Sequence, residues 1–163
     1  MKLLTLLPFM VLFTVFSSCS PDSIDGTAEL FTPELTIPEP TAFELEILEL
    51  INTHRLSLGL DSLQNMDIIR SQTYSHTDYM IDNQKISHDY FFKRSQFLMK
   101  HAGAIEVSEN VAYGYASAEG LVNAWIRSES HKVNIEGDFT NFDISAEKGT
   151  DGKWYYTNIF IKK

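Results

Sequence analysis

The chain has 163 residues, of which 44% are hydrophobic and 12% aromatic, so it is too apolar for a disordered protein and long enough for one packed domain. A single Cys excludes an intramolecular disulfide framework and any zinc site that needs several thiolates. The net charge of -9 argues against nucleic acid as a partner.

Residues 1–18 predict a signal peptide. Lys2 supplies a positive start, and residues 3–16 form an apolar stretch that is too short to span a bilayer comfortably. Ser17 and Ser18 are small residues of the kind that precede a processing site. We therefore expect the chain to be exported.

Cys19 follows this stretch directly, and residues 15–19 resemble the cleavage box of bacterial lipoproteins. That resemblance implies that Cys19 becomes the lipidated first residue of the mature protein. The membrane would then be a partner through the lipid anchor, on the periplasmic side of the cell envelope or on the surface of an outer membrane. An ordinary secretory signal with a Cys near its end is the alternative.

Residues 19–41 predict an extended tether. Residues 20–49 contain eight Asp or Glu and no Lys or Arg, so the negative charge of the chain is concentrated there. Four prolines, at 21, 33, 38 and 40, favour a stiff and solvated segment. The folded domain is accordingly expected over residues 42–163.

Helical signals dominate the first part of this domain. Thr41 and Glu44 form a capping box, which predicts a helix that Gly59 closes. Apolar spacing predicts further helices at about 67–83 and 90–101, and a fourth from Ser117 to about Glu129.

The C-terminal part changes to a strand pattern. Phe142, Ile144 and Ala146 alternate with polar neighbours, residues 149–152 favour a turn, and residues 153–162 read as a long strand. Both faces of that long strand are apolar, which is typical of a central strand in a layered α/β domain.

From about residue 44 onward, the order of short motifs resembles the CAP superfamily, also called SCP-like, in its bacterial disulfide-free branch. The matching segments are residues 51–55 (INTHR), 76–80 (HTDYM), 86–88 (ISH), 109–114 (ENVAYG), 125–131 (WIRSESH) and 155–160 (YYTNIF). The resemblance implies an α-β-α sandwich with a small antiparallel sheet of three or four strands between helical layers.

The same resemblance implies a cavity lined by two His and usually two acidic residues. Carried over by motif, these are His88, Glu109 and His131, while the place of the second Glu falls at Ser128 with Glu129 beside it. Two imidazoles and a carboxylate suit a divalent ion such as Zn, with His88 and His131 as metal ligands. We expect such an ion to be an optional ligand and not a cofactor that the protein requires. The alternative is structural: Glu109 bonds backbone donors in a buried turn, and His131 caps the fourth helix.

Two functions follow from these residues. One is a binding module, expected to be monomeric, whose cavity takes a cation, a lipid or a protein ligand. The other is a metal-assisted or Glu-assisted hydrolase such as a peptidase, for which a Ser beside His88 or His131 is a conceivable nucleophile. No catalytic residue is assigned. His76, which shares a helix face with Met80, is expected to be a hydrogen-bonded core residue.

Overall fold

The computed structural model describes residues 37–163, so the predicted signal peptide, Cys19 and most of the predicted tether lie outside the described residues. The elements in chain order are α1 (Ala42–Ser57), β1 (Gln64–Asn65), α2 (Asp67–Asp82), α3 (Phe91–Ala102), β2 (Glu106–Tyr113), α4 (Ala118–Arg127), α5 (Glu129–Ile135), β3 (Asn141–Lys148) and β4 (Trp154–Lys162). None of the helices within residues 37–163 is long and apolar enough to cross a bilayer.

The strands form one sheet in the order β1-β3-β4-β2. The three long strands are antiparallel, as predicted, and β4 lies between β3 and β2. The two-residue β1 instead runs parallel to β3, which makes the sheet mixed. Its position is fixed by Asn52 on α1, whose amide donates to the carbonyl of Leu63 at 3.0 Å and accepts from the Leu63 N–H at 2.8 Å.

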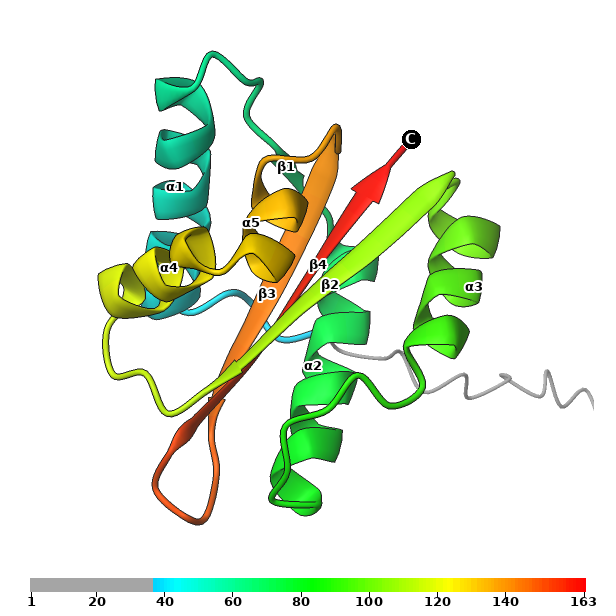
Figure 1. Ribbon diagram of the computed structural model, residues 1–163. Helices are drawn as coiled ribbons and strands as arrows, with labels where there is room; N and C mark the ends of the chain where they lie inside the picture. The colour runs from blue at the N-terminus through cyan, green and yellow to red at the C-terminus, as the bar shows by residue number, and fades with distance from the viewer. Residues whose placement is uncertain (1–36) are drawn as a thin grey trace, which may run out of the picture. The chain divides into compact units, whose positions relative to one another are not determined.

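Helices cover both faces of this sheet, which confirms the predicted α-β-α sandwich. Figure 1 shows α1, α4 and α5 on one side of the strands and α2 and α3 on the other. The larger core lies on the first side, where Ile51 and Trp125 pack with Tyr156 of the central strand. Smaller apolar clusters lie on the other side, around Ile69 and Met80 of α2.

The predicted capping box begins α1 and also joins it to the sheet. Thr41 accepts from the Glu44 N–H at 3.2 Å, and the Glu44 carboxylate accepts from the Thr41 N–H at 2.7 Å. The other Glu44 oxygen accepts from the backbone N–H of Ala146 in β3 at 2.8 Å. Glu44 is completely buried, so a local helix signal doubles as a tertiary contact.

A second buried carboxylate, Asp143 of β3, holds the start of α2. It accepts from the backbone N–H of Met66 at 3.2 Å and lies 3.5 Å from Nε of Arg70. Burial raises the pKa of Asp143 to about 6, although the Arg70 charge opposes that rise.

Besides β1, two elements were not expected from the sequence. Strand β2 was not predicted, because its centre is polar: Ser108, Glu109 and Asn110 interrupt any apolar alternation. The fourth predicted helix is α4, which begins after Ser117 and ends at Arg127, close to the expected Glu129. Helix α5 was not predicted; it is separated from α4 by Ser128, which takes an extended conformation (φ -99°, ψ 113°). His131 consequently lies within α5 and does not cap α4.

Candidate functional site

A cavity of about 520 Å³ opens between the end of β2, the segment before α3 and the junction of α4 with α5. Strand β2 contributes Val111, Ala112 and Tyr113, and the helical side contributes Trp125. Two imidazoles lie in its wall, those of His88 and His131. Among residues 37–163, no Asp, Glu, Lys or Arg lines it, so the site is apolar and aromatic with polar His and Ser groups.

His88 is held by a buried carboxylate beneath the cavity wall. Its Nδ1 lies 2.8 Å from Oε1 of Glu109, whose side chain is 1% exposed, while the His88 side chain is 53% exposed. Glu109 also accepts two hydrogen bonds of 2.8 Å from Nε and Nη2 of Arg94 on α3. The carboxylate is therefore paired with a guanidinium in a bidentate arrangement and orients one imidazole from behind.

His76 of α2 completes this buried group. Its Nε2 is 2.7 Å from the carbonyl of Ser87, and since a carbonyl only accepts, Nε2 carries the hydrogen. This bond fixes the residue that precedes His88. Burial lowers the pKa of His76, with the nearby Glu109 carboxylate opposing the shift. The prediction that His76 is a hydrogen-bonded core residue is confirmed.

His131 is oriented by its own helix start. Nδ1 lies 2.7 Å from Oγ of Ser128, and the ring stacks on Trp125 with 6.5 Å between centroids. The His131 carbonyl accepts from the side-chain amide of Asn110 at 3.1 Å, which ties α5 to β2. Burial lowers the pKa of His131, and the neighbouring His88 lowers it further, so the neutral imidazole is favoured.

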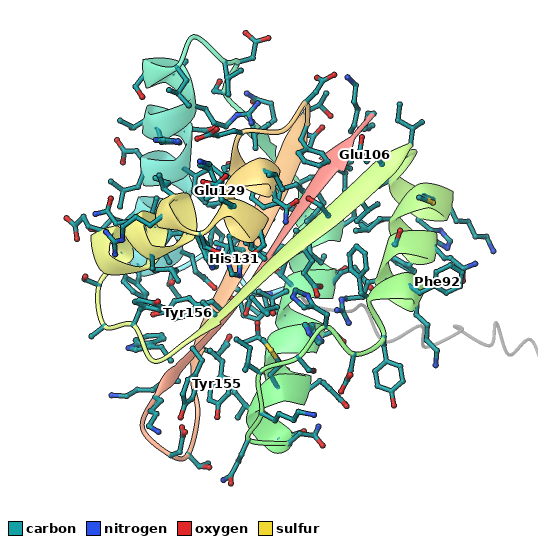
Figure 2. All side chains as sticks on the ribbon, in the orientation of Figure 1. Phe92, Glu106, Glu129, His131, Tyr155 and Tyr156 are labelled. Atoms are coloured by element: carbon teal, nitrogen blue, oxygen red, sulfur yellow. The ribbon has the colours of Figure 1, made fainter. Side chains whose placement is uncertain are left out.

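The structure thus brings together four of the five residues predicted for the cavity. His88, His131 and Ser128 line it, and Glu109 lies just beneath His88. Glu129 is not part of the group: its side chain is 82% exposed and pairs with Lys132 at 2.7 Å. Glu129 is the first residue of α5, and its side chain points to solvent. Figure 2 labels Glu129 and His131 on α5.

A three-ligand metal site does not fit this arrangement. Within residues 37–163 no group of three or more His, Cys, Asp or Glu is placed to hold one ion. The carboxylate of Glu109 is not free to serve as a metal ligand, because both of its oxygens already accept from Arg94. What is left for a cation is the pair of imidazoles, each with Nδ1 engaged by a neighbour.

Arg94 is the functional neighbour that the sequence reasoning missed. It lies on the buried face of α3 with Leu98 and Ala102, at a spacing of four residues. A cation on the apolar stripe of a short helix is a signal for a buried acidic partner, because an unpaired charge is costly to bury. That signal does not say which acid is the partner.

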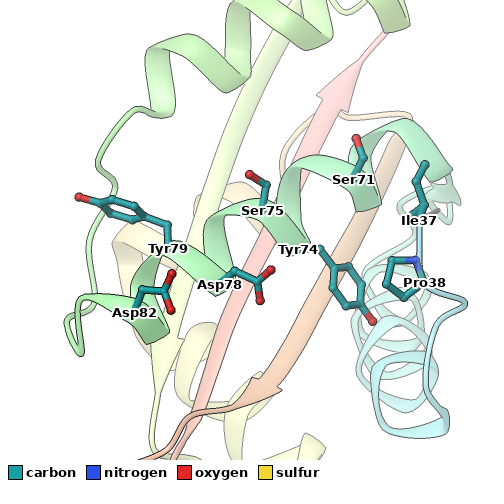
Figure 3. Close-up of a pocket in the computed structure, with 8 residues that line it drawn as sticks. All are labelled: Ile37, Pro38, Ser71, Tyr74, Ser75, Asp78, Tyr79 and Asp82. Atoms are coloured by element: carbon teal, nitrogen blue, oxygen red, sulfur yellow. The ribbon is translucent and has the colours of Figure 1, made fainter. Parts of the chain in front are cut away.

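A second hollow of similar volume, about 570 Å³, lies on the outer side of α2 and contains none of the predicted site residues. Figure 3 shows Asp78, Asp82 and Tyr79 along the helix, with Pro38 at the far end. Its acidic groups repel one another: burial and the nearby Asp82 raise the pKa of Asp78.

Comparison with known proteins identifies the family. The sequence profile described as "CAP: Cysteine-rich secretory protein family" matches residues 48–160. Two curated relatives come from Bacillus subtilis (strain 168). The membrane protein YlbC is 31% identical over 88% of this chain and 42% of its own length, and the protein YkwD is 29% identical over 85% of this chain and 54% of its own. The chain therefore spans about half the length of these relatives.

Solved structures share the fold. An outer surface protein of Borrelia burgdorferi superposes with a TM-score of 0.67 at 23% identity, over 77% of this chain and 96% of that one. An extracellular protein of Bacillus anthracis that contains an SCP domain gives a TM-score of 0.63 at 25% identity, over 74% of this chain and 40% of that one.

Proposed function

Since this chain belongs to the cysteine-rich secretory protein (CAP) family, we propose that it is an exported binding module that holds its ligand in the cavity between His88 and His131. The observation that carries this proposal is the composition of the cavity wall. A concave, largely apolar surface with a few oriented polar groups is typical of a ligand site. The carboxylate that bonds His88, that of Glu109, is neutralised by Arg94, which suits a positioning role for that carboxylate better than a role as base.

Filling the cavity tests the proposal, because a bulky side chain in the wall excludes a ligand without touching the core. Ala124 on α4 lines the cavity, and its neighbour Asn123 lies on a different side of the same helix. We expect Ala124→Trp to abolish binding of any cavity ligand, and Asn123→Trp to retain it. Equal binding by both variants would refute the cavity as the site.

Export and lipid anchoring are part of the proposal. They are supported by the apolar stretch at residues 3–16, by Cys19 directly after it, and by relatives described as an outer surface protein and an extracellular protein. Metabolic labelling with palmitate should mark the wild type and fail to mark Cys19→Ser. Release of an unlabelled wild type into the medium would contradict the anchor.

Zinc binding at His88 and His131 stays a prediction. With two imidazoles and no free carboxylate, an ion has few protein ligands, so we expect weak and reversible binding. Affinity should fall as pH falls through the range where imidazole is protonated, since proton and metal compete for nitrogen. Calorimetric titration of the wild type against a His88→Ala/His131→Ala double variant decides this, and equal heats would remove the cation from the proposal.

One contact favours hydrolysis as a second candidate function. Oγ of Ser128 and Nδ1 of His131 are 2.7 Å apart, a nucleophile-to-base distance, and the neutral imidazole that burial favours is the form that accepts a proton. Among residues 37–163 no carboxylate bonds the His131 ring to orient it, so the pair lacks the third member of a triad. A fluorophosphonate probe should label the wild type and not Ser128→Ala if the pair is catalytic.

A further inference from the structure

Strand β2 forms one edge of the sheet, and its outer side is the side that faces the cavity. It pairs only with β4, as the strand order shows, and Figure 1 shows α3 beside its beginning and its arrowhead running on toward the turn before α4. An edge strand presents a row of backbone N–H and C=O groups that a further strand can pair with.

The register identifies which residues of β2 present those groups. The Gly114 N–H donates to the carbonyl of Trp154 at 2.8 Å, and in an antiparallel pair the direction of the backbone groups alternates from residue to residue. Residues with even numbers therefore bond β4, while Glu109, Val111 and Tyr113 direct their N–H and C=O outward. The Glu109 carbonyl agrees with this assignment, because it accepts from the side chain of Asn134 on α5, at 3.4 Å.

The outward groups of Val111 and Tyr113 have no hydrogen-bond partner within residues 37–163, and both residues line the cavity. One side-chain group of the cavity wall, the indole N–H of Trp125, also has no hydrogen-bond partner among the described residues, although Trp125 is only 2% exposed. Val111 is only 5% exposed, and buried polar groups are almost always paired, so the groups of Val111 and Trp125 indicate a ligand that carries both hydrogen-bond donors and acceptors. Tyr113 is 37% exposed and continues the same edge toward solvent.

We propose that the cavity binds an extended peptide segment of another protein, which adds as a strand along the outer edge of Val111–Tyr113. This inference rests on the proposed binding function and names its ligand class. A backbone in the extended form alternates donors and acceptors at the same period as β2, so a segment of about three residues satisfies both Val111 and Tyr113. An acyl chain offers no such groups and would leave the N–H of both residues unpaired.

The cavity wall also specifies the side chains of that segment. Tyr113, Tyr115 and Trp125 supply aromatic surface, and in the part of the chain that the structure describes no Asp, Glu, Lys or Arg lines the wall to pair with an ionic group. The residue that points into the cavity should therefore be uncharged and apolar or aromatic. Its affinity for the wall adds to the backbone pairing, which by itself is independent of peptide sequence.

The probe is a random heptapeptide phage library, panned on the full chain in detergent micelles. Enriched peptides are then synthesised and their binding is measured by fluorescence polarisation. N-methylation removes one backbone donor at a time, so a scan along the peptide should weaken binding at least tenfold at the two residues that pair with Val111 and Tyr113, which lie two apart. The residue between them should stay within about threefold.

A matched pair of variants tests the protein side. Tyr113→Pro and Tyr113→Ala both remove the ring, but only the proline also removes the outward N–H, at an edge position where proline is tolerated. We expect Tyr113→Pro to bind at least tenfold more weakly than Tyr113→Ala. If thermal melting shows that Tyr113→Pro does not fold, the positions at which N-methylation weakens binding decide by themselves whether the peptide adds as a strand.

The outcomes separate this inference from the function on which it rests. Peptides whose binding is lost in Ala124→Trp but shows no period of two would overturn strand addition and keep the cavity as a binding site. A library that yields no enriched peptide would also overturn it, and zinc titration would then still test the cavity. Peptides that bind Ala124→Trp as well as wild type would overturn both.

Discussion

Neutralising Glu109 should destabilise the whole domain, because it leaves the charge of Arg94 buried without a partner. The Arg94 side chain is 9% exposed and the Glu109 side chain 1% exposed, so little solvent is available to replace the lost contact. Breaking a buried ion pair on one side costs about 3 to 5 kcal/mol. We expect Glu109→Gln to lower the free energy of unfolding by that amount, which corresponds to roughly 10 to 20 °C in Tm for a domain of this size.

His88 supplies the internal control for this prediction. It touches the same carboxylate at 2.8 Å, but its side chain is 53% exposed, so His88→Gln should cost less than about 1 kcal/mol. Replacing both buried charges by apolar residues, in Arg94→Met/Glu109→Leu, should cost less than either single change, since it removes the charges together.

Urea denaturation followed by far-UV circular dichroism measures the wild type, Glu109→Gln, His88→Gln, the double variant and its two single variants, Arg94→Met and Glu109→Leu. The reasoning fails if Glu109→Gln loses less than about 1 kcal/mol. It also fails if the double variant loses as much free energy of unfolding as its two single variants lose in sum, because Arg94 and Glu109 would then not act as a pair.

Three further predictions follow from the fold. Burial raises the pKa of Asp143, so its carboxyl binds a proton more tightly in the folded protein than in the unfolded chain. The free energy of unfolding should therefore rise as pH falls from about 7 toward 4, by at most about 3 kcal/mol. Asp143→Asn should lack this dependence in denaturation curves measured across that range. Thr41→Ala should lower the free energy of unfolding by about 1 kcal/mol. Glu44→Ala should lower it by about 3 kcal/mol, because it also leaves the buried N–H of Ala146 in β3 unpaired. Equal losses of Tm would contradict a role for Glu44 beyond the helix cap. Deleting residues 20–36 should leave Tm unchanged, whereas deletion through residue 40 should lower it, since the carbonyl of Pro38 accepts from Arg70 on α2 at 3.3 Å.

Elements with local signals could be predicted from the sequence, and those set by distant contacts could not. The capping box of α1 involves residues three apart, and the apolar pattern of β4 follows from burial on both faces. Strand β2 escaped prediction because its central polar residues are buried in hydrogen bonds with α3 and α5. Such residues look like a loop until the partner helices are in place.

The site followed the same rule. Family motifs supplied His88, Glu109 and His131, and the structure brings these three together around one cavity. The pairing of Glu109 with Arg94 could not be read from the chain, because fifteen residues separate them and no motif links them. Glu129 shows the opposite error, since a position one step along a helix faces another direction.

The place of β4 in the sheet sets the order in which this domain can fold. β4 lies between β3 and β2, yet it follows the other three strands of the sheet in the chain. About forty residues separate β2 from β4, the strand with which it pairs. Neither long pairing of the sheet exists before Trp154–Lys162 is available. β3 pairs with β4 across the short turn after Lys148, whereas β2 pairs with β4 across the whole of that longer segment. The sheet of a chain emerging from the ribosome therefore cannot close until Trp154–Lys162 has been made. For a protein that we propose is exported, late closure of the sheet favours an unfolded polypeptide during translocation.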